Sequence, residues 1–194
     1  MSESSRWKDG VDPSISREQG FIPYMAAVLK SRLSSQTIAK EMGFKGFQGK
    51  SVLDVGCRDG RFINVFRDLG ASAVYGIDPD SSEMSKAVSL GILDTQHAIP
   101  AKVEHIPPAM KGKFNVATVL NYNIPLQQTH SFLDSVSKTL KPDGQVVITV
   151  AENDMLRQIE PALRDRFKDI KIQRLEPGVN DYPHANLVIA NKKK

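Results

Sequence analysis

The alternation of apolar runs with amphipathic segments, from Ser51 to the end of the chain, is the feature that most restricts the fold. Short apolar runs such as "SVLDV" and "GQVVITV" predict strands, and the segments between them carry apolar residues at helical spacing. Strands that alternate with helices indicate βαβ units and a mostly parallel sheet. We therefore predict a doubly wound α/β domain, whose ligands bind at the carboxyl ends of the strands.

The predicted elements follow one another without an internal repeat. The strands are expected at residues 51–55, 73–78, near 95–101, 113–121, 144–150, 169–175 and 185–191. The helices are expected at residues 59–69, 80–90, 126–140 and 154–167. The last helix must bend or restart at Pro161, because proline has no amide hydrogen to donate within a helix.

The stretch "SVLDVGCRDGRF" joins the first of these strands to its helix, at the place where a nucleotide would bind. It is not a P-loop, because it lacks Gly-Lys-Ser/Thr, and it does not fit the dinucleotide pattern G-x-G-x-x-G. Asp54, at the end of the strand, would repel a pyrophosphate but attract a cation such as an α-ammonium group. The start of the helix, near Asp59, would favour a carboxylate. A zwitterionic amino-acid tail satisfies both demands.

S-adenosylmethionine combines such a tail with a ribose and an adenine. A ribose calls for an acidic residue at the end of the second strand, roughly 20 residues further on. In "VYGIDPD", Asp78 stands there, 24 positions after Asp54. The ligand chemistry therefore favours this cofactor over a dinucleotide.

The sequence resembles the class I S-adenosylmethionine-dependent methyltransferases. "VLDVGCRDG" is similar to their first motif, "YGIDPD" to their second, and "LKPDGQVVIT" to the turn that opens their fifth strand. The resemblance implies a Rossmann-like sheet of about seven strands, of which the last is antiparallel. It also implies cofactor contacts from Asp54, from Asp78 and Pro79, and from the loop that holds Gly56, Cys57, Arg58 and Gly60.

Two positions depart from the family pattern. The family commonly has glycine where Arg58 stands, and we expect that this position does not need a positive φ, so that the arginine side chain points to solvent while its amide serves the ligand. In "PAKVEHIP", Lys102 aligns with an acid that the family often uses for the adenine amino group. The adenine would then contact backbone groups around Val103, or Glu104. Cys57 is expected to be a small buried residue rather than a nucleophile.

The methyl acceptor is expected beside "LNYNIP", at the end of the fourth strand. Asn121 could contact the acceptor or the cofactor, and Tyr122 could line the pocket; alternatively Asn121 caps the strand and Tyr122 packs under the N-terminal helices. In the loop "VNDYPHANL", His184 could act as a general base, because imidazole titrates near neutrality, or could have no role. The histidines lack metal-ligand spacing, so no metal is predicted.

Residues 1–48 are predicted to be an N-terminal arm followed by a helical lid, and residues 49–194 the cofactor-binding domain. The spacing of Phe21, Ile22 and Met25 predicts a helix, with Phe21 in its core and Tyr24 free to face the pocket. We expect this segment to cover the cofactor and to complete the acceptor pocket.

Composition restricts the partners and the compartment. The 194 residues carry a net charge of +4, and the basic residues of the C-terminal third are interleaved with acidic ones. A small-molecule acceptor is therefore favoured, with RNA or protein as alternatives. No apolar run is long enough to span a membrane, and a cytoplasmic enzyme is expected. The alternative from a different class is a catalytically inactive, methyltransferase-like interaction module.

Overall fold

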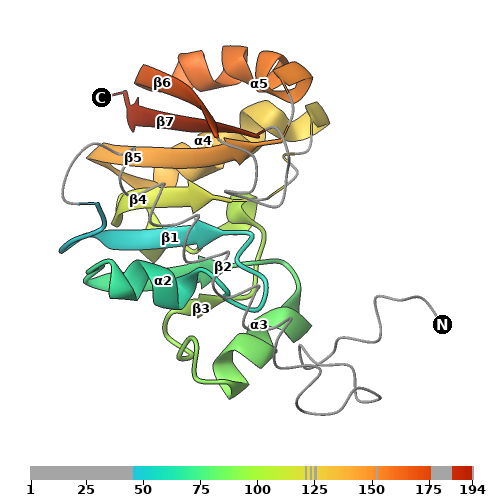
Figure 1. Cartoon of the computed structure of the whole chain (residues 1–194). Helices are drawn as coiled ribbons and strands as arrows, with labels where there is room; N and C mark the ends of the chain where they lie inside the picture. Colours follow the sequence, from blue (N-terminus) through green and yellow to red (C-terminus); the bar gives the residue numbers. More distant parts are fainter. Residues whose placement is uncertain are drawn as a thin grey trace.

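The computed structural model describes residues 46–120, 122, 124, 126–151, 153–175 and 185–193. One sheet of seven strands forms the centre, in the order β3-β2-β1-β4-β5-β7-β6 (Figure 1). Its strands are β1 (Ser51–Val55), β2 (Ala73–Ile77), β3 (Ala98–Ile99), β4 (Phe114–Val119), β5 (Leu140–Val150), β6 (Phe167–Leu175) and β7 (Ala185–Lys192). The predicted fold class is therefore confirmed.

The direction of the strands also agrees with the prediction. The strands β3, β2, β1, β4 and β5 pair in parallel, whereas β7 runs antiparallel to both of its neighbours, β5 and β6. The chain order turns at β1, which has β2 on one side and β4 on the other. The carboxyl ends of these three strands thus form the switch point at which ligands of open α/β sheets bind.

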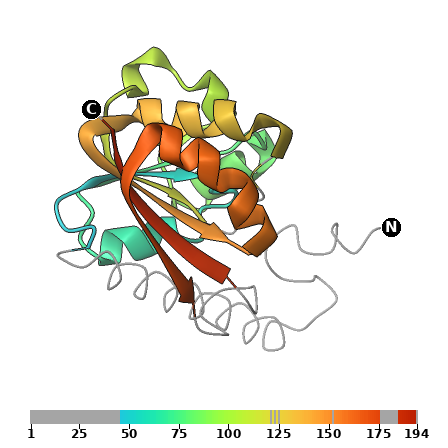
Figure 2. The same ribbon diagram turned by 90° about the horizontal axis from the view of Figure 1, so that it is seen from above.

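Helices cover both faces of the sheet. They are α2 (Ile63–Asp68), α3 (Ser81–Ser89), α4 (Thr129–Thr139) and α5 (Asn153–Arg166), with short 3-10 turns η2 (Val103–His105), η3 (Pro108–Met110) and η4 (Leu126–Gln128). Figure 2 shows α4 and α5 together on one face and α2 on the other. Each face has its own buried core, because successive residues of a strand point to opposite sides: Leu53 packs on the α4 side and Val52 on the α2 side.

One predicted helix start was wrong. The first helix begins at Ile63 rather than at residue 59, because the preceding residues form turns in which Gly60 has a φ of +82°. The last helix does not restart at Pro161, which lies inside α5, so of the two expected outcomes, a bend or a restart, the restart is excluded. Pro161 is exposed, so water can satisfy the carbonyl group that lost its helical partner.

Several predictions lie outside the described residues. They are the N-terminal arm, the helical lid with Phe21 and Tyr24, and the side chains of Asn121 and His184. The proposed boundary between an N-terminal segment and the cofactor domain therefore stays a prediction.

Candidate cofactor site

The glycine loop follows β1 directly, between the first strand and its helix, as predicted. Gly56 and Gly60 both have a positive φ, of +75° and +82°, which glycine adopts without steric cost. Arg58 also has a positive φ, of +50°. The expectation that Arg58 would not need such a conformation was therefore wrong.

The amides of this loop are already used within the protein. The Gly56 and Cys57 amides donate to the carbonyl oxygen of Ile77, at 2.8 and 3.3 Å. The Arg58 amide donates to Oδ2 of Asp78 at 3.0 Å. The helix start that was expected near Asp59, where it would favour a carboxylate, lies four residues later, at Ile63.

Asp78 lies at the end of β2 with only 6% of its surface exposed. Its second oxygen, Oδ1, accepts a hydrogen bond of 2.8 Å from the Asp80 amide. A carboxylate oxygen has two lone pairs, so each oxygen keeps one for a further donor. The carboxylate is therefore held by the backbone in a fixed position and can still accept hydrogen bonds from two hydroxyl groups.

Asp54 is buried at the end of β1, beside β4. Its Oδ1 accepts a hydrogen bond of 2.8 Å from the Thr118 hydroxyl, while Oδ2 is buried without a hydrogen-bond partner. Burial raises the pKa of Asp54 to about 7, although the Thr118 hydrogen bond acts in the opposite direction and the Asp78 charge adds to the rise. A buried carboxylate oxygen without a donor favours a cationic or hydrogen-donating ligand.

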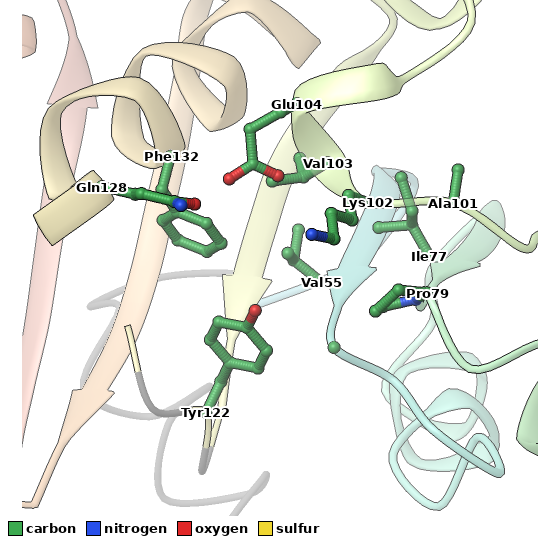
Figure 3. Close-up of a pocket in the computed structure, with 11 residues that line it drawn as sticks. Val55, Ile77, Pro79, Ala101, Lys102, Val103, Glu104, Tyr122, Gln128 and Phe132 are labelled. Atoms are coloured by element: carbon green, nitrogen blue, oxygen red, sulfur yellow. The ribbon is translucent and has the colours of Figure 1, made fainter. Parts of the chain in front are cut away.

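A pocket opens at the carboxyl ends of β1, β2 and β4 (Figure 3). It brings together residues from the glycine loop, the second motif, the η2 turn and the start of α4. They are Val55, Gly56, Ile77, Pro79, Ala101, Lys102, Val103, Glu104, Tyr122, Gln128 and Phe132. The structure thus gathers Gly56, Pro79, Val103, Glu104 and Tyr122 of the predicted site residues around one hollow.

The η2 turn supplies the charged part of the pocket wall. Val103 is buried, and Figure 3 shows the Glu104 carboxylate and the Lys102 amine directed into the same hollow. Lys102 is thus one of the residues that line the pocket. The Lys102 amine can donate hydrogen bonds and the Glu104 carboxylate can accept them. The pocket therefore suits a ligand that carries both hydrogen-bond acceptors and hydrogen-bond donors.

Cys57 behaves as expected of a small buried residue. Its side chain is 4% exposed and its sulfur lies 3.5 Å from the sulfur of Met84. Burial, followed by the charges of Asp54 and Asp78, raises the pKa of its thiol far above the usual range. A thiol that stays protonated at neutral pH is a poor nucleophile.

Sequence reasoning missed two kinds of residue. Gln128 and Phe132 line the pocket from η4 and α4, within the segment that was predicted only as a helix. Thr118 holds Asp54 through the register of β1 and β4, which pairs the two residues directly. Only knowledge of which strands are neighbours could have identified Thr118.

Comparison with known proteins decides the family. A model of the methyltransferase domain family matches residues 25–188. The chain belongs to this family. The prediction of a class I S-adenosylmethionine-dependent methyltransferase domain is thereby confirmed, and with it S-adenosylmethionine as the cofactor.

Individual relatives are distant, and they differ in their acceptors. A tRNA U34 carboxymethyltransferase of Idiomarina loihiensis is 28% identical over 126 residues, which are 60% of this chain and 38% of that protein. A mitochondrial ubiquinone biosynthesis O-methyltransferase of Schizosaccharomyces pombe is 26% identical over 118 residues, or 58% and 42% of the two chains. The chain thus spans about two fifths of the length of these curated relatives.

Solved structures agree in fold. Magnesium protoporphyrin IX methyltransferase from Synechocystis PCC 6803, solved with bound S-adenosylmethionine, superposes with a TM-score of 0.67 at 14% identity, over 98% of this chain and 91% of that one. A Methanococcus maripaludis protein described as a putative S-adenosyl-L-methionine-dependent methyltransferase gives a TM-score of 0.72 at 10% identity, over 90% of each chain.

The described part of the chain has neither a membrane-spanning helix nor a cluster of metal-binding side chains. None of its helices has the length and apolar character needed to cross a bilayer. Its histidine, cysteine and acidic side chains form no cluster of three or more that could hold a metal ion.

Proposed function

We propose that the protein transfers a methyl group from S-adenosylmethionine to a small-molecule acceptor. The observation that carries this proposal is the pair of buried carboxylates at the switch point, Asp54 and Asp78. The free lone pairs of Asp78 fit the two ribose hydroxyls. The orphaned Oδ2 of Asp54 fits a group with positive charge or a hydrogen-bond donor, such as the α-ammonium group. A pyrophosphate is negatively charged, so both carboxylates would repel it.

The remaining pocket residues have roles that follow from their chemistry. Pro79 and Val103 offer apolar surface to the flat adenine base, and Glu104 can accept a hydrogen bond from its amino group. Gly56, Cys57, Arg58 and Gly60 shape the loop that carries the Asp78 contact. When bound, the cofactor supplies a methyl group on a positively charged sulfur atom. The rate of methyl transfer then depends mainly on the alignment of the acceptor atom with the methyl group and on the exclusion of water from the site.

A small acceptor is favoured by the charges around the pocket. Asp78, Asp80 and Glu104 lie at this end of the sheet, and a dense array of negative charge such as RNA would be repelled by them. Lys102 and Arg58 offset part of this charge. Among the relatives, the names of the ubiquinone enzymes support a small acceptor, whereas those of the tRNA enzymes support RNA.

Asn121 and His184 are retained as candidates for contact with the acceptor, on the sequence argument alone. Residues 1–48 are likewise proposed as the lid, because an open sheet leaves its ligand exposed at the strand ends. Hydrogen exchange of residues 1–20 tests the lid. Stronger protection with S-adenosylhomocysteine is expected, and equal protection in both states would contradict it.

Labelled S-adenosylmethionine and a cell extract test the activity. The extract is separated into metabolites, RNA and protein, and each fraction is incubated with the protein and with its Asp78→Ala variant. Label transferred to the metabolite fraction by the unmodified protein alone is expected. Transfer to RNA or protein instead would correct the acceptor class. Binding of the cofactor without transfer to any fraction would support an inactive interaction module.

A further inference from the structure

The side chain of Tyr122 packs between the glycine loop and α4. A methyl group built on Gly56 would lie 2.5 Å from Cδ2 of Tyr122, so the tyrosine ring rests directly on the glycine backbone. The ring also stacks with Phe132, at 5.4 Å between centroids and 11° between planes. Both contacts engage the ring and leave the hydroxyl group aside. The ring is therefore fixed by its packing, and its hydroxyl group is held in place.

The hydroxyl group of Tyr122 points into the pocket (Figure 3). It has no hydrogen bond to a described residue. Burial raises the pKa of Tyr122, and the negative charges of Glu104 and Asp78 raise it further. The phenol is therefore neutral at physiological pH, and it presents a fixed O–H donor to the pocket.

We propose that Tyr122 binds the nucleoside part of the cofactor, rather than the methyl acceptor as its sequence position indicated. This inference rests on the proposed function. The hydroxyl shares one pocket with Pro79 and Val103. The ribose hydroxyls can donate to Asp78, but the adenine ring nitrogens and the ribose ring oxygen only accept hydrogen bonds. Carboxylates cannot serve those atoms, whereas the Tyr122 hydroxyl can.

The test is the Tyr122→Phe variant, which keeps the ring between Gly56 and Phe132 and removes only the hydroxyl. Calorimetry is run with S-adenosylhomocysteine and with 5′-methylthioadenosine, which has the nucleoside but no amino-acid tail. We expect Tyr122→Phe to weaken both ligands by a similar factor, about 5- to 10-fold, which corresponds to the loss of one hydrogen bond.

Tyr75→Phe is the matched control. Tyr75 lies in β2 and contacts His97 and Phe114 instead of the pocket. The affinity of the Tyr75→Phe variant for both ligands should equal that of the unmodified protein. Unfolding midpoints of both variants show whether either has lost its fold, so that a weaker affinity is assigned to the missing hydroxyl.

Three results would overturn the inference. Unchanged affinity of Tyr122→Phe for both ligands would show that the hydroxyl does not touch the cofactor. A loss confined to S-adenosylhomocysteine would place it at the amino-acid tail. Loss of turnover at saturating cofactor, with unchanged binding, would return Tyr122 to the acceptor. If the unmodified protein binds neither ligand, the proposed function itself fails, which is a separate outcome.

Discussion

The backbone amide of Arg58 donates a hydrogen bond of 3.0 Å to Oδ2 of Asp78. This contact joins the glycine loop after β1 to the end of β2, so one carboxylate holds the loop and is also the group proposed to bind the ribose. Arg58 makes this contact in a left-handed backbone conformation, with a φ of +50°.

Substitution of Asp78 should therefore affect stability as well as binding. Asp78→Ala removes the acceptor of the Arg58 and Asp80 amides and the proposed partner of the ribose hydroxyls. We expect S-adenosylhomocysteine affinity to fall by about 1–3 kcal/mol and the free energy of unfolding to fall by a similar amount. Calorimetry and urea unfolding measure the two effects. Asp80→Asn is the control, because asparagine also caps a helix and should change both quantities little.

Gly56→Ala should be more damaging than its backbone conformation alone explains. Gly56 and Gly91 have a similar positive φ, +75° and +68°, but a methyl group at Gly91 meets nothing within 4 Å. Gly91→Ala should therefore cost about 1 kcal/mol of stability from backbone strain. Gly56→Ala adds the contact with Tyr122, and we expect it to cost about 1–3 kcal/mol more.

A double variant separates strain from contact. In a Tyr122→Ala background the extra cost of Gly56→Ala should largely disappear, since the ring is gone. Urea unfolding of the single and double variants gives the interaction energy. Equal costs of Gly56→Ala in both backgrounds would contradict a direct contact between the ring and Gly56.

Arg58→Gly should stabilise the protein. A non-glycine residue at positive φ carries a strain of about 1 kcal/mol, and glycine removes it, although glycine also makes the unfolded chain more flexible. We expect a net gain of up to about 1 kcal/mol in the free energy of unfolding. Arg61→Gly is the control. Arg61 does not have a positive φ, so glycine relieves no strain there, and this substitution should be neutral or destabilising. A loss of stability in Arg58→Gly would show that the arginine side chain matters more than the strain.

Asp54 should make stability depend on pH. Its pKa is about 7 in the folded protein and about 4 when unfolded, so the folded state binds more protons between these values. The contribution of Asp54 to the free energy of unfolding is therefore greatest at acidic pH. It falls as the pH rises from about 4 to 7 and stays constant at higher pH. The effect is on the order of a few kcal/mol.

Asp54→Asn isolates this effect, because asparagine cannot titrate. Relative to the unmodified protein, the variant should gain stability between pH 5 and pH 8, as followed by urea unfolding at both values. Asp80→Asn, at an exposed carboxylate whose pKa is lowered by its hydrogen bonds to the start of α3, should not reproduce the gain. An identical difference at both pH values would show that Asp54 is ionised throughout.

Local sequence patterns were sufficient for most of the fold. The apolar periodicity located each strand of the described sheet, and glycine spacing identified the loop after β1. These signals work because a strand or a glycine turn is specified by residues that are adjacent in sequence. The start of α2 was missed because the loop before it is held by contacts from the end of β2.

The details of the candidate site depend on contacts between distant segments. Tyr122 rests on Gly56, 66 positions earlier in the chain, because β1 and β4 are neighbours in the sheet. The Thr118 hydrogen bond to Asp54 has the same origin. Residue types indicated the carboxylates, but only the strand order shows which atoms remain free for a ligand.

Binding of S-adenosylhomocysteine compared with NAD is the most direct test of the central claim. Calorimetry of the full chain should show binding of S-adenosylhomocysteine and none, or much weaker binding, of NAD, because we propose that Asp54 repels a pyrophosphate and attracts an α-ammonium group. Asp78→Ala should weaken the first ligand. Tighter binding of NAD than of S-adenosylhomocysteine would contradict the claim and indicate a dinucleotide site.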